Sequence, residues 1–329
     1  MGYHKSNGAI LVHILVVLSL NYMPCKAQLS TNFYDNTCPS ALSTIRASVN
    51  DAVSSNRRNA ALLIRLHFHD CFVQGCDASL LLEGDSSEKS SPANNGVLGY
   101  EIINDAKAAV ERVCPGVVSC ADILAVAARD ASVAVLTQLY IPVGGPSWSL
   151  RLGRRDSKDS NAGQALTDLP RANMDLSQLI ANFNHKSLTP RDLVALSGSH
   201  TIGQARCVTF RTRLYNNASN INIDATFASN LRSNCPANPP DGNGNLEPLD
   251  IVTPNTFDNS YFRNLVDGKG LLGSDQVLFS GDSTDSIVNE YIDNPSTFES
   301  DFAAAMVKMS EIGLLTGANG VIRTLCTAA

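Results

Sequence analysis

The segment from Ala61 to Ser79 combines an apolar helical run with side chains that can do chemistry. Arg65 and His69 are four residues apart, so at about 100° per residue they lie on one face of a helix. On the same scale His67 is turned roughly 160° away from His69. Burying a guanidinium without a partner is costly, so ordinary core packing does not explain Arg65 on this face. The pair therefore predicts a functional site.

Oxygen and sulfur groups follow this pair directly. Asp70 precedes a short loop between Cys71 and Cys76, and Asp77 and Ser79 come immediately after it. Hard oxygen atoms at such close spacing, completed by backbone carbonyls, suit a calcium ion with roughly seven or eight ligands. A solvated acidic turn is the alternative interpretation that the sequence leaves open.

Two long segments carry a resemblance to a known family. Residues 65–79, reading RLHFHDCFVQGCDAS, resemble the distal signature of the secretory plant peroxidases, the class III haem peroxidases. Residues 192–207, reading DLVALSGSHTIGQARC, resemble their proximal haem-ligand signature. The resemblance extends over residues 28–329. It implies an all-α fold of two lobes, with haem between the distal and proximal helices and only minor short β elements.

The resemblance also implies an activity. A secreted haem peroxidase reduces hydrogen peroxide to water while it oxidises small phenolic donors one electron at a time. Its expected roles are lignin and suberin cross-linking, peroxide removal and the response to stress.

On the distal side, the resemblance assigns His69 as the general base and acid, and Arg65 as the group that stabilises developing negative charge. Phe68 would shape the pocket. The family also uses a glutamate, matched by Glu88, to support an asparagine that holds the histidine. Counting forward from Glu88 gives Asn94, whereas counting back from the Gly99-Tyr100 pair gives Ala93; we take Asn94.

On the proximal side, the resemblance implies that His200 binds the iron of one haem b and that Asp275 bonds to its other ring nitrogen. Two calcium ions are implied as well. The distal ion would be held by Asp70, Val73 (carbonyl), Gly75 (carbonyl), Asp77 and Ser79, and the proximal ion by Thr201, Asp250, Thr253, Thr256 (carbonyl) and Asp258. Pro170 matches the carbonyl that binds phenolic donors.

The chain also departs from the family pattern. Leu98 stands where the family usually has an arginine, so a structural ion pair is in doubt. Asn173 and Met174 replace the aromatic residues often found near the donor site, which leaves the donor preference open.

Residues 1–27 are typical of a secretory signal peptide, with an apolar run from Ile10 to Leu20 that is too short to span a bilayer. A buried N-terminal helix is the alternative. Cleavage would leave a domain of residues 28–329 without a membrane span, and Gln28 would become pyroglutamate as in the family. The net charge of −6 becomes more negative when Lys5 and Lys26 leave, which disfavours nucleic acid as a partner.

Nine cysteines are present, and Cys25 would leave with the signal peptide. An even number in a secreted chain predicts four disulfides, but the residues alone do not give their connectivity. The family pattern implies Cys38–Cys114, Cys71–Cys76, Cys120–Cys326 and Cys207–Cys235. Asn217 is the predicted glycosylation site. We expect a monomer. We also expect secretion to the apoplast or cell wall, because the residues after Cys326 are too few for a vacuolar signal.

The elements that position these residues are mostly helical. Leu42, Ile45, Val49 and Val53 have the spacing of an amphipathic helix, and further helices are predicted at 101–113, 121–135, 257–266 and 297–312. Capping residues predict helix starts at Asp175 and Thr189. Residues 142–156 are predicted as loop or short strand, and residues 216–259 mostly as loop.

Two other functions remain as alternatives. A calcium-stabilised secreted binding protein could keep the scaffold without haem chemistry, although Arg65, His69 and His200 argue against it. A metal-dependent hydrolase could use His67, His69 and Asp70, but His67 and His69 diverge on a helix.

Overall fold

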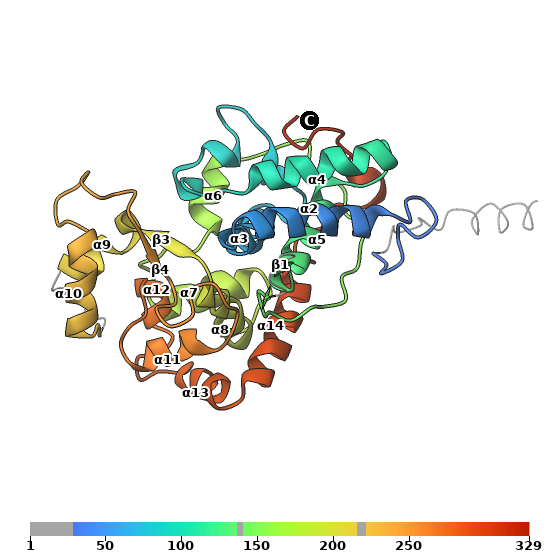
Figure 1. Ribbon diagram of the computed structural model, residues 1–329. Helices are drawn as coiled ribbons and strands as arrows, with labels where there is room; N and C mark the ends of the chain where they lie inside the picture. The colour runs from blue at the N-terminus through green and yellow to red at the C-terminus, as the bar shows by residue number, and fades with distance from the viewer. Residues whose placement is uncertain (1–28, 137–140, 216–221, 329) are drawn as a thin grey trace, which may run out of the picture.

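The computed structural model describes residues 29–136, 141–215 and 222–328, and helices dominate it. In Figure 1 the upper lobe contains α2 (Ala41–Ser55), α3 (Arg58–Phe72), α4 (Tyr100–Val113), α5 (Cys120–Ser132) and α6 (Ala162–Asp168). The lower lobe contains α7 (Leu176–His185), α8 (Pro190–Ser197), α11 (Ser260–Val266), α12 (Gly273–Gln276), α13 (Asp285–Asp293) and α14 (Pro295–Met309). The predicted all-α fold is confirmed.

The upper lobe is organised around α5. Every residue of this helix is buried, and α2, α3 and α4 all pack against it. The apolar stripe predicted for α2 is present, because Ile45, Val49 and Val53 are each fully buried. Burial of that stripe fixes α2 against its neighbours and so supports α3, which carries Arg65 and His69.

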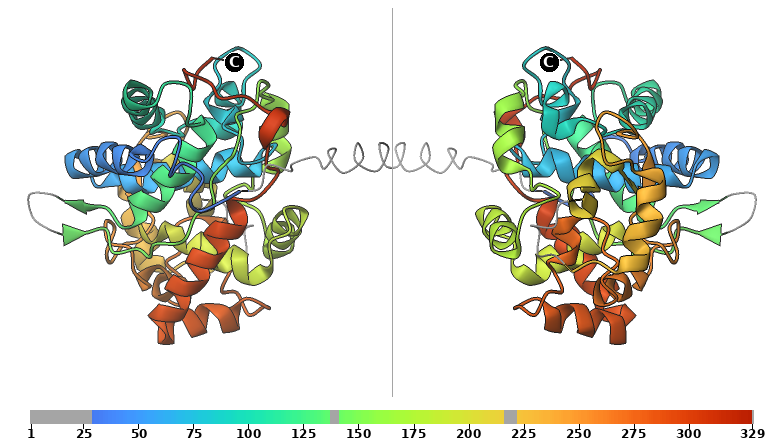
Figure 2. Two further views of the ribbon diagram at one scale, coloured as in Figure 1. Left: turned by 90° about the vertical axis from the view of Figure 1, so that its right-hand side faces the viewer. Right: turned by 90° about the vertical axis from the view of Figure 1, so that its left-hand side faces the viewer.

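Strands make only two short antiparallel pairs among the described residues. β1 (Val135–Leu136) pairs with β2 (Ile141–Pro142), and this hairpin projects from the body of the molecule in Figure 2. β3 (Gln204–Arg206) pairs with β4 (Leu246–Pro248). β3 follows the short 3₁₀ helix η4 (Gly198–Thr201), so the second pair anchors the chain just beyond His200.

Two elements differ from the sequence predictions. Residues 225–234 lie in the segment predicted to be mostly loop, but they form α10 (Ala225–Asn234), which lies beside α9 (Cys207–Tyr215) in Figure 1. The Asp224 side chain caps this helix by accepting from the Phe227 amide at 2.7 Å, and Phe227 and Leu231 are buried in a small core with α9. The helix predicted to reach Val135 ends at Ser132, because the chain enters β1.

The four disulfides join the pairs implied by the family pattern: Cys38–Cys114, Cys71–Cys76, Cys120–Cys326 and Cys207–Cys235. The third links positions 206 residues apart and ties α5 to the end of the chain. Within the described ranges, no helix is long and apolar enough to cross a bilayer. The predicted signal peptide, Gln28 and Asn217 lie outside the described residues.

A buried ion pair joins the lobes. Arg154, whose side chain is fully buried, places Nη1 2.9 Å from Asp122 Oδ1 of α5. Its Nε and Nη2 atoms donate to the Ser310 carbonyl, just after α14, at 3.0 and 2.6 Å. Tyr34 Oη donates to the other Asp122 oxygen at 2.7 Å. Both charges are therefore surrounded by partners, as a buried pair requires.

Candidate active site

Arg65 and His69 lie on one face of α3, as the four-residue spacing predicts. Arg65 Nε donates to His69 Nε2 at 3.2 Å, and His69 Nδ1 lies 2.6 Å from Asn94 Oδ1. Since Nε2 accepts from Arg65, the imidazole proton belongs on Nδ1, where it is donated to the amide oxygen. Burial lowers the pKa of His69 to about 3, and the charge of Arg65 acts in the same direction while the Asn94 hydrogen bond opposes it. His69 is thus a neutral base with a lone pair on Nε2.

Asn94, rather than Ala93, reaches the distal histidine. It ends the 3₁₀ helix η3 (Pro92–Asn94) and is buried. Its Nδ2 atom donates to the main-chain carbonyl of Glu88 at 2.8 Å, so Glu88 orients the amide through its backbone. This contact agrees with the count forward from Glu88.

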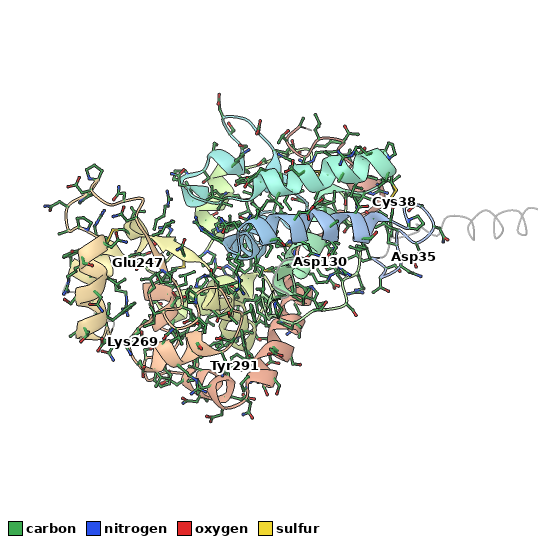
Figure 3. All side chains as sticks on the ribbon, in the orientation of Figure 1. Asp35, Cys38, Asp130, Glu247, Lys269 and Tyr291 are labelled. Carbon is green, nitrogen blue, oxygen red and sulfur yellow. A yellow bond between two sulfur atoms is a disulfide. The ribbon has the colours of Figure 1, made fainter. Side chains whose placement is uncertain are left out.

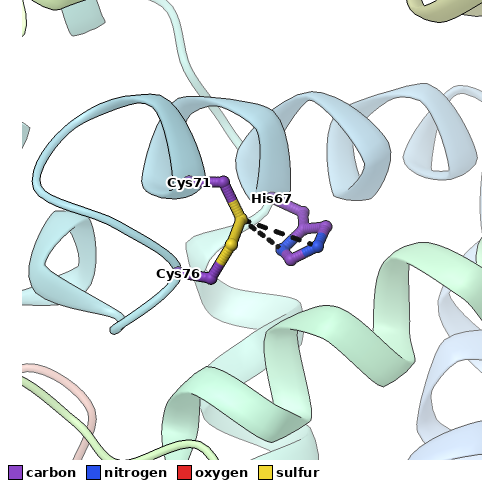
Figure 4. Close-up of side chains that lie close together, drawn as sticks. All are labelled: His67, Cys71 and Cys76. Atoms are coloured by element: carbon purple, nitrogen blue, oxygen red, sulfur yellow. Dashed lines mark hydrogen bonds between the residues drawn. A yellow bond between two sulfur atoms is a disulfide. The ribbon is translucent and has the colours of Figure 1, made fainter. Parts of the chain in front are cut away.

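His67 points to the other side of α3. Its Nε2 atom lies 2.9 Å from Ser310 Oγ, and its ring sits against Cys71 Sγ at 3.6 Å (Figure 4). The Cys71–Cys76 disulfide already joins both sulfur atoms, so the compact His67, Cys71 and Cys76 cluster is a packing unit and not a metal site. Among the described residues, His67, His69 and Asp70 do not form a metal-binding group.

The predicted distal calcium residues line the loop that follows α3. Burial raises the pKa of Asp70 well above its usual range, and the charges of Asp77 and Glu88 raise it further. Burial likewise raises the pKa of Asp77 to about 6 and that of Glu88 to about 8. Ser79 Oγ and Glu88 Oε2 are buried oxygens without a hydrogen-bond partner in the described part of the chain. A divalent cation would offset the negative charge of these closely spaced carboxylates. The oxygen atoms gathered here therefore fit calcium as a ligand set.

Gly75 fixes the shape of the same loop. Its φ is +156°, and a Cβ built there would lie 2.4 Å from the Gly313 carbonyl oxygen. Next to it, the Cys76 amide donates to the Ile312 carbonyl at 3.0 Å. The loop is therefore held by backbone contacts with the segment after α14, and position 75 has no room for a side chain.

We expect Gly75→Ala to lower the free energy of unfolding by about 1–3 kcal/mol more than Gly84→Ala, because the added methyl group must displace backbone. Gly84 is the matched control, since its φ is +141° and a Cβ there would meet nothing within 4 Å. Chemical denaturation in the presence of calcium measures the difference. Equal losses in the two variants would show that the contact with Gly313 does not hold the loop.

The second predicted histidine follows α8. Thr189 caps α8 by a reciprocal pair of bonds with Asp192, as predicted, and the helix passes into η4, which contains His200. His200 Nδ1 lies 2.7 Å from Asp275 Oδ1 of α12. This bond leaves Nε2 as the ring nitrogen that can bind iron. The His200 side chain is 34% exposed and that of Asp275 only 2%, so the carboxylate supports the ring from the protein interior.

The predicted proximal calcium residues converge beside His200. Thr201 Oγ1 lies 3.2 Å from Asp250 Oδ2, 3.4 Å from Asp258 Oδ1 and 3.5 Å from the Thr256 carbonyl oxygen. Thr253 Oγ1 lies 3.3 Å from the same Asp250 oxygen. Hydroxyl, carboxylate and carbonyl oxygens thus surround one region, which is the ligand chemistry that calcium prefers.

The remaining predicted residues flank the distal site. The Phe68 ring packs 4.1 Å from that of Phe72 and 5.8 Å from that of His69. Pro170 is half-buried in the connection between α6 and α7. Leu98, at the position where the family usually has an arginine, is 45% exposed.

Sequence reasoning missed Tyr261 of α11. This side chain is buried, and its hydroxyl donates to Asp275 Oδ1 at 3.0 Å. No spacing rule could find the contact, because the two residues lie on separate helices and meet only when α11 and α12 pack together.

Comparison with known proteins extends these observations. The family model described as Peroxidase matches residues 45–294. The chain is 67% identical to a basic peroxidase of Zinnia elegans over 330 residues, which cover 99% of each sequence. It is 59% identical to the lignin-forming anionic peroxidase of Nicotiana sylvestris (95% of each) and 52% identical to Peroxidase P7 of Brassica rapa (91% of this chain and 99% of the relative). This chain therefore belongs to the peroxidase family, among the class III plant peroxidases, which are haem enzymes that use hydrogen peroxide.

Proposed function

We propose that this peroxidase binds one haem b between α3 and η4, with His200 as the iron ligand, and oxidises phenolic donors. In the overall reaction, two phenolic donor molecules and one hydrogen peroxide give two phenoxyl radicals and two water molecules. The main support for this proposal is that the two histidines have different hydrogen-bond partners. His69 bonds to a neutral amide and stays a free base, whereas His200 bonds to a carboxylate that strengthens it as a ligand.

When bound, haem would supply the redox chemistry: an iron that can be oxidised by peroxide by two equivalents and reduced by donors one electron at a time. The chain moves the protons. His69 Nε2 accepts a proton from one peroxide oxygen and delivers it to the other oxygen, which leaves as water. Asn94 holds the tautomer that keeps Nε2 unprotonated at the start. Arg65 donates a hydrogen bond to the oxygen on which negative charge develops as the O–O bond breaks.

Donors would bind near the Pro170 carbonyl, and Phe68 would shape the pocket. The printed name of the Nicotiana relative, a lignin-forming peroxidase, supports phenolic donors and a role in lignin or suberin cross-linking. Peroxide removal and a stress response would follow from the same reaction. Asn173 and Met174 would set the choice among donors, because they follow Pro170 in the connection before α7.

Two calcium ions would complete the enzyme, one in the loop after His69 and one around Thr201. Both predicted ligand sets begin at the residue after a working histidine, Asp70 after His69 and Thr201 after His200. Loss of calcium should therefore change the haem environment on both sides before the disulfide-linked scaffold unfolds.

Calcium removal tests this coupling together with haem binding. We expect the purified holoenzyme to show a Soret band near about 400 nm that shifts when peroxide is added. Chelation should displace the resting band and slow peroxide turnover by about tenfold, the scale of losing a supporting ligand shell. Calcium should restore both readings and magnesium should not, since magnesium demands octahedral geometry. An unchanged band and rate, with calcium loss confirmed by elemental analysis, would contradict the coupling. Absence of any Soret band in the untreated protein would contradict the haem proposal itself.

We also place the enzyme outside the cell, in the apoplast or cell wall, and expect a monomer that needs neither nucleic acid nor membrane. Four disulfides within the described residues support an oxidising compartment. Full-length chain carrying an internal tag should be recovered in extracellular fluid. Retention of the mature form in vacuoles would overturn this assignment.

A further inference from the structure

Asp275 receives more hydrogen bonds than the support of one histidine requires. Its Oδ1 atom accepts from His200 Nδ1 at 2.7 Å and from Tyr261 Oη at 3.0 Å, and its Oδ2 atom accepts from the Leu272 amide at 3.1 Å. Asp275 and Tyr261 are each 1% exposed, so no bulk water competes for these bonds. The phenol and the imidazole therefore share one carboxylate oxygen.

Sharing an acceptor has a direct electronic consequence. A carboxylate oxygen that accepts a second hydrogen bond has less charge to offer the first donor. The Tyr261 hydroxyl thus draws negative charge away from the His200 N–H group and limits how far the imidazole becomes imidazolate-like. The Tyr261 ring also lies edge-on to the His200 ring, with centroids 6.2 Å apart, so it fixes the ring plane from the side.

We propose that Tyr261 is a positioning residue that weakens the donor strength of His200 toward the haem iron by sharing Asp275 Oδ1, and so raises the ferric/ferrous reduction potential. This inference rests on the proposed role of His200 as the iron ligand. It adds a third member to the His200–Asp275 pair, one that acts only through the carboxylate.

The protein contains a matched control for this tyrosine. Tyr291 is also buried and also donates its hydroxyl to a carboxylate, that of Asp301, at 2.9 Å. Both tyrosine rings contact Phe262, at 5.1 Å between centroids, and Figure 3 places Tyr291 among the helices of the lower lobe. Asp301 belongs to α14 and bonds to Arg191 instead of a histidine. Removing the Tyr291 hydroxyl therefore reproduces the packing change without touching Asp275.

The test compares Tyr261→Phe and Tyr291→Phe as holoenzymes. We expect Tyr261→Phe to lower the equilibrium constant for one-electron reduction of the iron by about three- to tenfold, where tenfold corresponds to about 59 mV. The iron–imidazole stretching band of its ferrous form should move to higher frequency in the resonance Raman spectrum. Tyr291→Phe should match wild type in both readings. No shift in Tyr261→Phe, or equal shifts in the two variants, would overturn the proposal.

A second measurement should shift the reduction potential in the opposite direction, without deleting an atom. Biosynthetic replacement of tyrosine by 3-fluorotyrosine makes the hydroxyl a stronger donor, so the potential of the wild-type sequence should rise. The same replacement in Tyr261→Phe should leave the potential unchanged. A rise of equal size in both sequences would assign the effect to other tyrosines and contradict the role of Tyr261.

Asp275→Asn separates this inference from the proposed function. If the wild type shows no iron–imidazole band, or if Asp275→Asn leaves that band at its wild-type frequency, the assignment of His200 and Asp275 is wrong. If Asp275→Asn moves the band to lower frequency and Tyr261→Phe leaves it unmoved, only the role of Tyr261 is wrong.

Discussion

His69→Ala should slow the reaction of the ferric enzyme with hydrogen peroxide by roughly 10²–10⁴-fold, the usual contribution of a positioned general acid–base group. The physical reason is that no other described group hydrogen-bonded at this site can take the peroxide proton: Arg65 is a cation and Asn94 is an amide. Haem binding should persist, because the proposed iron ligand is a different residue, His200. Stopped-flow absorbance in the Soret region gives the bimolecular rate constant.

Two further variants make this result interpretable. His185→Ala removes an exposed histidine at the end of α7 and should leave the rate unchanged. Asn94→Ala should slow the reaction less than His69→Ala, because it frees the tautomer of His69 but keeps the base. A peroxide rate constant for His69→Ala within a few-fold of wild type would remove His69 from its assigned role.

Asp122→Ala should lower the free energy of unfolding by about 3–5 kcal/mol, the cost of leaving a buried charge without its partner. The Arg154 side chain is fully buried, and its remaining hydrogen bonds go to the neutral carbonyls of Arg151 and Ser310. The variant also takes an acceptor from Tyr34 Oη and from the Gly153 amide. Chemical denaturation with the disulfides intact measures the loss.

An exposed ion pair provides the comparison for this stability prediction. Lys269 lies 3.1 Å from Asp267, with side chains that are 32% and 58% exposed, and Figure 3 shows Lys269 on the lower lobe. Lys269→Ala should therefore cost no more than about 1 kcal/mol. Tyr34→Phe, which deletes one bond to Asp122, should fall between the two variants. If Asp122→Ala were no more destabilised than Lys269→Ala, Arg154 would have to find another partner or reach solvent.

The sequence by itself determined the features that depend on neighbouring residues. The shared face of Arg65 and His69 follows from helical geometry over four residues, and the start of α8 at Thr189 follows from a cap whose partner is three residues away. The crowding of oxygen atoms between Asp70 and Ser79 is likewise visible in the order of the residues. Family resemblance supplied what spacing could not, including the disulfide pairs.

Tertiary structure decided the features that depend on contacts between distant segments. The choice of Asn94 over Ala93 depends on how a loop returns to α3 across 25 residues, and one residue more or less changes which side chain arrives. Helix α10 was missed because its stability comes from burying Phe227 and Leu231 against α9, whereas its own composition is polar. Tyr261 meets Asp275 only where α11 and α12 pack together. Periodicity and capping act within a few residues, but burial and shared hydrogen bonds arise only when separate helices come together.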